Sequence, residues 1–338
     1  RTSIEAEIEE LNINIEVMIA SEDVLVSVTK EGYIKRTSLR SYSASSEDDF
    51  TIKENDHVVG LIEMNTTDKI LLFTNKGRYV SIPVHELPDI RWKDMGHHLS
   101  NMTALDSDEK IVHSIPIRDF SEERYLTFFT KNGMVKRTEL NEYDAKRYTK
   151  PLIAINLKDD DDEVVQVDLS TGGSNVFITS NRGYGLWYEE SEIPVVGARA
   201  LGVIAMQLKE GEYVVNGQLF DDELSVPNIF VITQRGACKR MNITEFSKSR
   251  RAKRGVVMLR ELKGKPHRIR GFYIISDNDK IHFRTSTDEV HSILPLELPT
   301  SDRLSNGSFV IDSDSDGEVV DVWKGASYKK PFETDENS

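Results

Sequence analysis

A repeated motif is the feature that most constrains how this chain of 338 residues can fold. A run of β-branched and aromatic residues, a Thr or Ser, two polar residues, a Gly and a second β-rich run recur together. Successive Thr or Ser positions lie 45, 56, 50, 53 and 52 residues apart. Five copies and a sixth that ends in Asp cover residues Val24–Gly32, Ile70–Gly77, Leu126–Gly133, Val176–Gly183, Ile229–Gly236 and Ile281–Asp288. A fixed period of this length indicates a repeat architecture, and it falls at the upper end for propeller blades.

Each copy predicts a β-hairpin, because Gly supplies the positive φ that a tight turn needs. Asp288 replaces this Gly in the sixth copy, and Asp tolerates the same backbone region better than most residues. Further apolar runs follow the hairpins, so each unit offers about four short strands. These runs are 58–62, 111–117, 152–157, 201–206, 256–259 and 309–311. We therefore predict an all-β, propeller-like array of six blades with few helices; two β-sandwiches of three repeats each are the alternative.

The repeats divide the chain into three parts. Residues 1–23 form an N-terminal linker, in which the alternating apolar residues of 11–19 predict an entering strand. Residues 24–324 form the repeat domain, and no Pro/Gly/Ser-rich linker interrupts them. Residues 325–338 are polar and predict a disordered tail.

The charge of the chain is unevenly distributed. The net charge is −14, yet residues 233–270 hold 13 Lys and Arg against 2 Asp and Glu, a local excess of +11. The remainder therefore carries −25. Such segregation indicates a surface that can attract phosphate on an otherwise acidic molecule.

Basic residues recur at one offset in the second strand of several hairpins. These are Lys35 and Arg36, Lys136 and Arg137, Lys239 and Arg240, with Arg78 directly after its Gly. Equivalent offsets in equivalent repeats predict one circumferential row of cations, which suits the phosphates of a bent duplex. The alternative is that basic residues on strand edges only discourage aggregation.

Two clusters strengthen the prediction of a DNA-binding rim. The first comprises Lys248, Arg250, Arg251, Lys253 and Arg254, and the second comprises Lys146, Arg147 and Lys150 at the corresponding place in the third repeat. The first cluster lacks the interleaved aromatic residues that would stack on single-stranded bases, so we expect contacts to duplex phosphates. A solvated loop without a partner is the competing interpretation.

Several short motifs fail the tests for catalytic or metal chemistry. Gly183 and Gly185 lack the third Gly of a dinucleotide-binding loop. His97 and His98 have no further ligand at metal-like spacing, and the run Asp159–Asp162 lacks the Gly and terminal Glu of a calcium loop. The single cysteine, Cys238, predicts a buried structural thiol in a reducing compartment. We predict no catalytic residue, no metal and no cofactor.

The repeats and their basic residues resemble the C-terminal domain of the A subunit of DNA gyrase and topoisomerase IV. The resemblance rests on 22–29 with 32–36, on 71–78, and on Pro83–Asp94, which is most similar to the topoisomerase IV form of Gram-positive bacteria. It implies a six-bladed β-pinwheel that binds and bends the transported DNA segment on its rim without reading its sequence. Gyrase members carry a basic Gln-Arg-Arg-Gly-Gly-Lys-Gly box in the first blade, whereas Ser43–Phe50 here is acidic. This departure favours topoisomerase IV over gyrase-like wrapping.

The resemblance also implies partners and a location. The parent enzyme is an ATP-dependent type II topoisomerase, whose catalytic tyrosine lies in an N-terminal breakage-reunion domain and whose B subunit hydrolyses ATP in a heterotetramer. We expect the domain alone to be monomeric, without catalytic activity, cytoplasmic and associated with the nucleoid, or peripheral at the inner face of the membrane within its complex. Two other functions stay open: a protein-binding propeller that uses its acidic surface, and a propeller hydrolase with ligands at a central channel.

Overall fold

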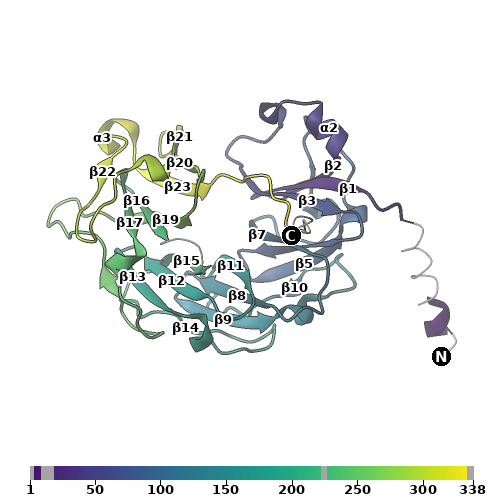
Figure 1. The fold of residues 1–338 in the computed structure, drawn as a ribbon, viewed down its shortest axis with the longest axis horizontal. Helices are drawn as coiled ribbons and strands as arrows, with labels where there is room; N and C mark the ends of the chain where they lie inside the picture. The colour runs from purple at the N-terminus through teal and green to yellow at the C-terminus, as the bar shows by residue number, and fades with distance from the viewer. Residues whose placement is uncertain (1–3, 9–18, 222–226, 333–338) are drawn as a thin grey trace, which may run out of the picture.

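The protein is described by a computed structural model, which covers residues 4–8, 19–221 and 227–332. Six small antiparallel sheets are arranged as the blades of a ring, as the repeats predict (Figure 1). In spatial order, blade 1 contains β3 (Val58–Asn65), β1 (Asp23–Thr29), β2 (Tyr33–Ser38) and β6 (His97–His98). Blade 2 contains β10 (Leu152–Ile153), β5 (Arg78–Pro83), β4 (Lys69–Thr74) and β7 (Ile111–Ile117). Blade 3 contains β11 (Val164–Ser170), β8 (Tyr125–Thr130), β9 (Met134–Glu139) and β14 (Val203–Ile204).

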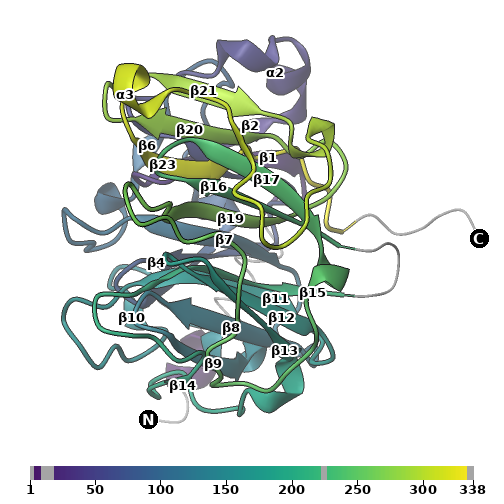
Figure 2. The same cartoon turned by 90° about the vertical axis from the view of Figure 1, so that its left-hand side faces the viewer.

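The remaining blades follow the same plan, except that the sixth has three strands. Blade 4 contains β15 (Val214–Phe220), β12 (Asn175–Ser180), β13 (Tyr184–Glu189) and β18 (Val256–Val257). Blade 5 contains β19 (Ile269–Ile275), β16 (Asn228–Thr233), β17 (Ala237–Asn242) and β22 (Ser308–Phe309). Blade 6 contains β21 (Val290–Ile293), β20 (Ile281–Thr285) and β23 (Val319–Lys324). In the side view, the sheets of neighbouring blades lie next to one another (Figure 2).

Helices in the described part of the chain are short, in line with the all-β array that the repeats predict. The α-helices are α2 (Leu39–Ser43), α3 (Ser313–Asp316) and a short segment at residues 4–8. The 3-10 helices are η1 (Glu47–Asp49), η2 (Val84–Glu86), η3 (Leu99–Asn101), η4 (Leu140–Tyr143), η5 (Glu190–Glu192), η6 (Ile243–Glu245) and η7 (Pro295–Glu297). None of the described helices has the length and apolar character needed to cross a membrane.

All six predicted hairpin turns are present. The five turn glycines have φ between 75° and 103°, and Asp288 adopts φ 65° in the sixth. The prediction that each apolar run forms a strand of its own repeat is only partly right. The runs from 152 onward form strands that join the sheet of the preceding blade. The inner strands of blades 3 to 6 are β11, β15, β19 and β23, whereas the runs at 152–157, 201–206, 256–259 and 309–311 contain strands that join the preceding blade.

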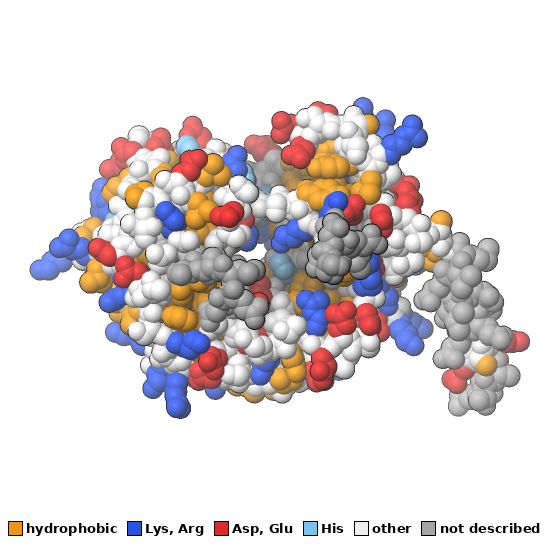
Figure 3. All heavy atoms as spheres, viewed as in Figure 1, with side chains coloured by type: hydrophobic (Ala, Val, Ile, Leu, Met, Phe, Trp, Pro, Cys, Tyr) orange, Lys and Arg blue, Asp and Glu red, His pale blue; other side chains and the backbone are white. Residues whose placement is uncertain are grey.

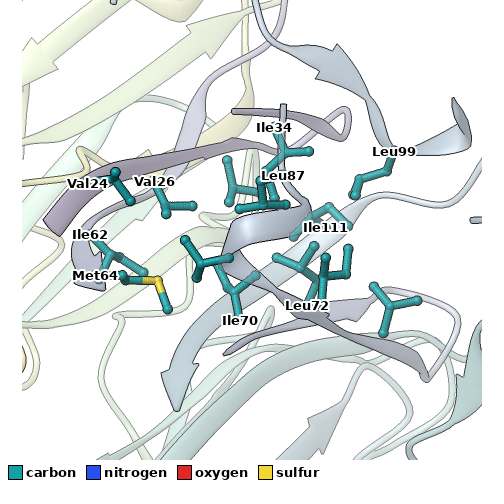
Figure 4. Close-up of a cluster of buried hydrophobic side chains, with 14 residues drawn as sticks. Val24, Val26, Ile34, Ile62, Met64, Ile70, Leu72, Leu87, Leu99 and Ile111 are labelled. Carbon is teal, nitrogen blue, oxygen red and sulfur yellow. The ribbon is translucent and has the colours of Figure 1, made fainter. Parts of the chain in front are cut away.

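This strand exchange links each blade to its neighbour. After the second hairpin strand, the chain passes through a 3-10 helix and returns to the preceding blade as its fourth strand; β6, for example, pairs with β2, and β14 pairs with β9. It then continues into the inner strand of its own blade. The hydrophobic core consequently lies between blades: Val26 and Ile34 of blade 1 share one cluster with Ile70 and Leu72 of blade 2 (Figure 4).

Of the two ends of the chain, only the C-terminal one can be compared with the predicted domain organisation. The predicted entering strand at 11–19 lies almost wholly outside the described residues. The predicted disordered tail is wrong for 325–332, because Lys329 forms a parallel bridge with Ile62 of β3. The polar composition of this segment gave no sign that its backbone would dock on a strand edge.

Candidate nucleic-acid interface

Five segments on the outside of the ring carry the chain from one blade back to the preceding blade. These return loops comprise residues 84–96, 140–151, 190–202, 243–255 and 295–307. Four of them end in a glycine, Gly96, Gly202, Gly255 or Gly307, immediately before the fourth strand. A Cβ at any of these glycines would meet a backbone carbonyl of the hairpin strand at under 3.0 Å. The glycines thus allow each loop to press directly on the preceding blade.

The three lysines predicted at the shared offset of the hairpin strands do not face solvent, which corrects the sequence-based interpretation. Lys35, Lys136 and Lys239 are at most 2% exposed, and each ammonium group points into a return loop. Lys35 Nζ donates to the carbonyls of Arg91 at 3.1 Å, Trp92 at 2.6 Å and Asp94 at 2.5 Å. These lysines hold the return loops against the hairpin strands, and the prediction that they contact phosphate is wrong.

The other two lysines make the same kind of contact. Lys136 Nζ lies 3.1 Å from Gly197 O and 2.5 Å from Ala198 O. Lys239 Nζ donates to three carbonyls of 302–305 at 2.6–3.3 Å. Burial lowers the pKa of Lys136 to about 7 and those of Lys35 and Lys239 to about 8. Carbonyl oxygens compensate part of the cost of burying each charge.

The arginines that follow these lysines hold the same loops at a second point. Arg36 Nε donates to Leu87 O at 3.0 Å, Arg137 Nε to Ile193 O at 2.7 Å, and Arg240 Nη2 to Leu298 O at 2.7 Å. All three are half-buried. Each Lys-Arg pair is therefore a two-point clamp, and its recurrence reflects the repeated need to fasten a loop. Arg78 differs, since it pairs with the buried carboxylate of Glu109.

The other two return loops carry the predicted clusters, and they reach blades without a Lys-Arg clamp. Val80 and Ser81 stand at the clamp positions in β5, and Leu186 and Trp187 stand there in β13. Six cations on these loops are exposed: Lys146, Arg147, Lys150, Lys248, Arg250 and Lys253.

Two members of the cluster at 248–254, Arg251 and Arg254, hold the structure together. Arg251 donates from Nε to Glu192 O at 2.9 Å and from Nη1 to Ile204 O at 2.7 Å. Arg254 forms an ion pair with the buried carboxylate of Glu212. Lys248 approaches Glu189 at 3.4 Å, but both side chains are solvent-exposed. This leaves Lys248, Arg250 and Lys253 as the residues of the cluster that can reach a phosphate.

Alignment of the return loops on their fourth strands reveals cations that sequence reasoning missed. Each loop has a Lys or Arg four to six residues before that strand, and the missed residues are Arg91, Lys93, Arg199 and Arg303. The first three are exposed, whereas Arg303 is half-buried and donates to Val257 O at 2.6 Å. The signal that could have found them is the glycine before the strand, which fixes the register of the loops. Lys and Arg side chains project from the periphery of the ring (Figure 3).

The first blade has an acidic segment where the others send out a return loop. Residues 39–57 form α2 and η1 and lie over the loop of blade 2, where Trp92 Nε1 donates to Ser46 O at 3.0 Å and Thr51 Oγ1 donates to Lys93 O at 2.7 Å. Glu47, Asp48 and Asp49 are exposed here. The acidic residues consequently lie beside the return loop that carries Arg91 and Lys93.

The channel at the centre of the ring differs from the outer rim in the residues that line it. It has a volume of about 960 Å³ and is lined mainly by the inner strands. Burial raises the pKa of Asp168 and lowers that of His113 to about 4. Within the described ranges, no group of three or more His, Cys, Asp and Glu is placed to hold a metal ion. Cys238 is buried, and burial raises the pKa of its thiol to about 12.

Comparisons with known proteins agree with this geometry. Residues 23–62, 68–118, 124–170, 174–220 and 227–276 match the family described as "DNA gyrase C-terminal domain, beta-propeller". The A subunit of DNA topoisomerase 4 from Bacillus subtilis is 52% identical over 96% of the chain and 40% of that protein, and its counterpart in Staphylococcus aureus (strain MRSA252) is 39% identical over 95% and 40%. The chain thus spans about two fifths of the length of these relatives.

Solved structures show the same relationship. A crystal structure of the C-terminal domain of DNA topoisomerase IV superposes with a TM-score of 0.86 at 54% identity, covering 91% of this chain and 94% of that one. A DNA gyrase A C-terminal domain superposes with a TM-score of 0.65 at 23% identity, covering 90% and 100%, and supports the fold alone. With five blades matched in sequence and the exchanged strands in place, the chain belongs to the family of DNA gyrase C-terminal beta-propeller domains.

Proposed function

We propose that the chain binds duplex DNA along the cationic rim of its return loops, bends it, and presents it as the transported segment to a type IIA topoisomerase. The observation that carries the proposal is that all five return loops have a Lys or Arg four to six residues before the fourth strand, and that four of the loops expose it on the outside of the ring. Phosphates of a duplex that follows a curved surface recur in the same way.

The residues proposed to contact phosphate are Lys146, Arg147, Lys150, Lys248, Arg250, Lys253, Arg91, Lys93 and Arg199. They are Lys and Arg without neighbouring exposed stacks of aromatic rings, so contacts to the backbone should dominate and sequence preference should be weak. The half-buried residues Arg36, Arg137, Arg240, Arg251 and Arg254 contribute positive potential but hold the return loops in place, and Arg78 pairs with Glu109.

The parent enzyme proposed for this domain is topoisomerase IV, and the names of its relatives support this assignment. The acidic segment at 47–49, in place of a basic box, supports relaxation and decatenation over gyrase-like wrapping. The proposed partners are duplex DNA, the breakage-reunion domain on the same polypeptide, and the ATPase B subunit in a heterotetramer. A nucleoid-associated, cytoplasmic location follows from that role, and we propose that the domain has no catalytic residue or cofactor of its own.

A salt series on the isolated chain tests DNA binding directly. Affinity for a duplex of about 40 base pairs should fall with salt, with a log–log slope steeper than about −4, because each neutralised phosphate contributes about −0.9. Fluorescence transfer between the duplex ends should rise on binding if the DNA bends. Micromolar or weaker binding that ignores salt would overturn the proposal and favour a protein partner for the rim.

A further inference from the structure

The junction between blade 6 and blade 1 is built differently from the other five. At each of those five, the inner strands of neighbouring blades pack together and an exchanged strand crosses the junction. At the sixth, β22 returns to blade 5, and residues 39–57 of blade 1 remain over blades 1 and 2. In the described structure, no strand of one of these two sheets joins the other, so the ring has one weak junction (Figure 1).

Few side chains hold this junction. His57 of blade 1 stacks on Trp323 of blade 6, with ring centroids 4.5 Å apart and an interplanar angle of 9°. Lys30 and Asp321 approach at 3.9 Å, and both are partly exposed to solvent. An ion pair of that kind contributes little.

The segment 325–332 crosses from blade 6 to the free edge of β3. Its start is fixed on blade 6, where Gly325 N donates to Lys280 O at 2.8 Å. Its end is fixed on blade 1, where Glu63 N donates to Lys329 O at 2.8 Å and Lys329 N donates to Leu61 O at 3.0 Å. Because β3 is the edge strand of its sheet, the segment supplies a strand that the sheet otherwise lacks there.

Side chains extend this attachment across blade 1 to blade 2. Tyr328 contacts the ring of Tyr42, with centroids 5.5 Å apart, and Lys330 lies 3.8 Å from Glu63. The guanidinium of Arg118, held by Asp68 at 2.9 Å, lies 4.1 Å from the centroid of the Phe332 ring. The segment thus touches blades 6, 1 and 2.

We propose that residues 325–332 are a strap that closes the ring at its weak junction, and that release of the strap lets blades 6 and 1 separate. Two backbone hydrogen bonds on an exposed edge make the strap one of the parts of the ring that should open most readily. Separation at one junction of a ring changes the curvature of the whole rim. The consequence for DNA rests on the proposed function; the closure itself does not.

The matched variants are Lys329→Pro and Lys329→Ala. Both remove the lysine side chain, but only proline removes the N–H that donates to Leu61 O. A third variant ends after Lys324 and lacks the strap altogether. Spin labels on introduced cysteines, in a Cys238→Ala background, would report two distances: Glu54→Cys to Glu289→Cys across the weak junction, and Glu210→Cys to Lys263→Cys across the exchanged junction of blades 4 and 5. All four labelled side chains are exposed.

The proline variant and the shortened chain should lengthen and broaden the 54–289 distance and leave the 210–263 distance unchanged, while the alanine variant behaves as wild type. A 54–289 distance that is unchanged in both strap variants overturns the proposal, and so does a parallel change of both distances, which would indicate general loosening. On DNA, the strap variants should bend the duplex less at nearly unchanged affinity. If no variant binds DNA, the proposed function fails and the distances still decide the closure.

Discussion

The return loops fall into two classes that share a path through the fold but differ in where their positive charge lies. Three loops, ending on blades 1, 3 and 5, are held from below by a buried Lys-Arg clamp. Two loops, ending on blades 2 and 4, lack the clamp and carry the densest exposed cations instead. The same residue types therefore serve as internal fasteners in one class and as surface charge in the other.

A repeated basic motif is therefore not by itself evidence of a binding site. A lysine under a return loop can satisfy carbonyl groups that the loop would otherwise bury without donors. Where apolar residues replace it, as with Val80 and Leu186, the loop is fastened by its own residues, such as Tyr143, whose hydroxyl donates to Ala154 O at 2.9 Å. In these two loops most Lys and Arg side chains lie on the exposed surface of the loop, and among the described residues no lysine is buried beneath it.

Replacing a clamp lysine should give the largest effect on stability. Lys136→Met removes the only charged donor to Gly197 O and Ala198 O that the described structure shows, so we expect a loss of about 3 kcal/mol in the free energy of unfolding. Urea denaturation at pH 7 measures this loss. Arg147→Met, on an exposed cation, is the matched control and should stay within about 0.5 kcal/mol. A Met variant as stable as wild type would break the distinction between the classes.

Removing exposed cations should leave the stability unchanged and weaken DNA binding. The triple variant Lys248→Gln, Arg250→Gln, Lys253→Gln should unfold like wild type but bind duplex DNA about 10- to 100-fold more weakly, with a salt slope shallower by about 0.9 per lost contact. The control triple Lys158→Gln, Lys209→Gln, Lys263→Gln changes the same charge on exposed turns outside the return loops. Equal losses in both triples would mean that net charge, and not the rim, determines affinity.

The sequence predicted the hairpins and the number of blades because local chemistry determines them: Gly32 or Asp288 must accept positive φ wherever it stands. It could not separate Lys239 from Lys248, since burial depends on which loop of another blade lies above a strand. That pairing joins residues more than 60 positions apart, as in Lys239 with Arg303. Nor could it assign 152–157 to an exchanged strand, because an apolar run does not state which sheet it will join.

The return loop at 243–255 contains both a structural arginine, Arg254, and an exposed one, Arg250. Arg254→Ala should cost about 2 kcal/mol of stability, because it leaves the buried carboxylate of Glu212 without its guanidinium partner. Arg250→Ala, four residues earlier, should cost little stability yet weaken DNA binding several-fold. Thermal melts and binding isotherms on the two variants should therefore rank them in opposite orders; the same ranking in both assays would show that the loop acts as one unit.

The smallest expected effect is a pH dependence of the clamps. Burial lowers the pKa of Lys136 to about 7, whereas in the unfolded chain this lysine keeps an ordinary value near 10.4. Between these values the unfolded state binds more protons, so the penalty for burying the charge is relieved as pH rises, and stability should increase.

A pKa of about 7 in the folded state would give a gain of about 2 kcal/mol between pH 7 and 9. We expect wild type to show at least about 1 kcal/mol of this gain relative to Lys136→Met, with unfolding curves at both pH values as the measurement. The gain is small because the carbonyls of 197 and 198 favour the charged form and oppose desolvation. Arg147→Met should track wild type at both pH values. A gain absent from wild type would mean that the carbonyls offset burial completely, which would make the clamp a charged fastener at every pH at which the protein folds.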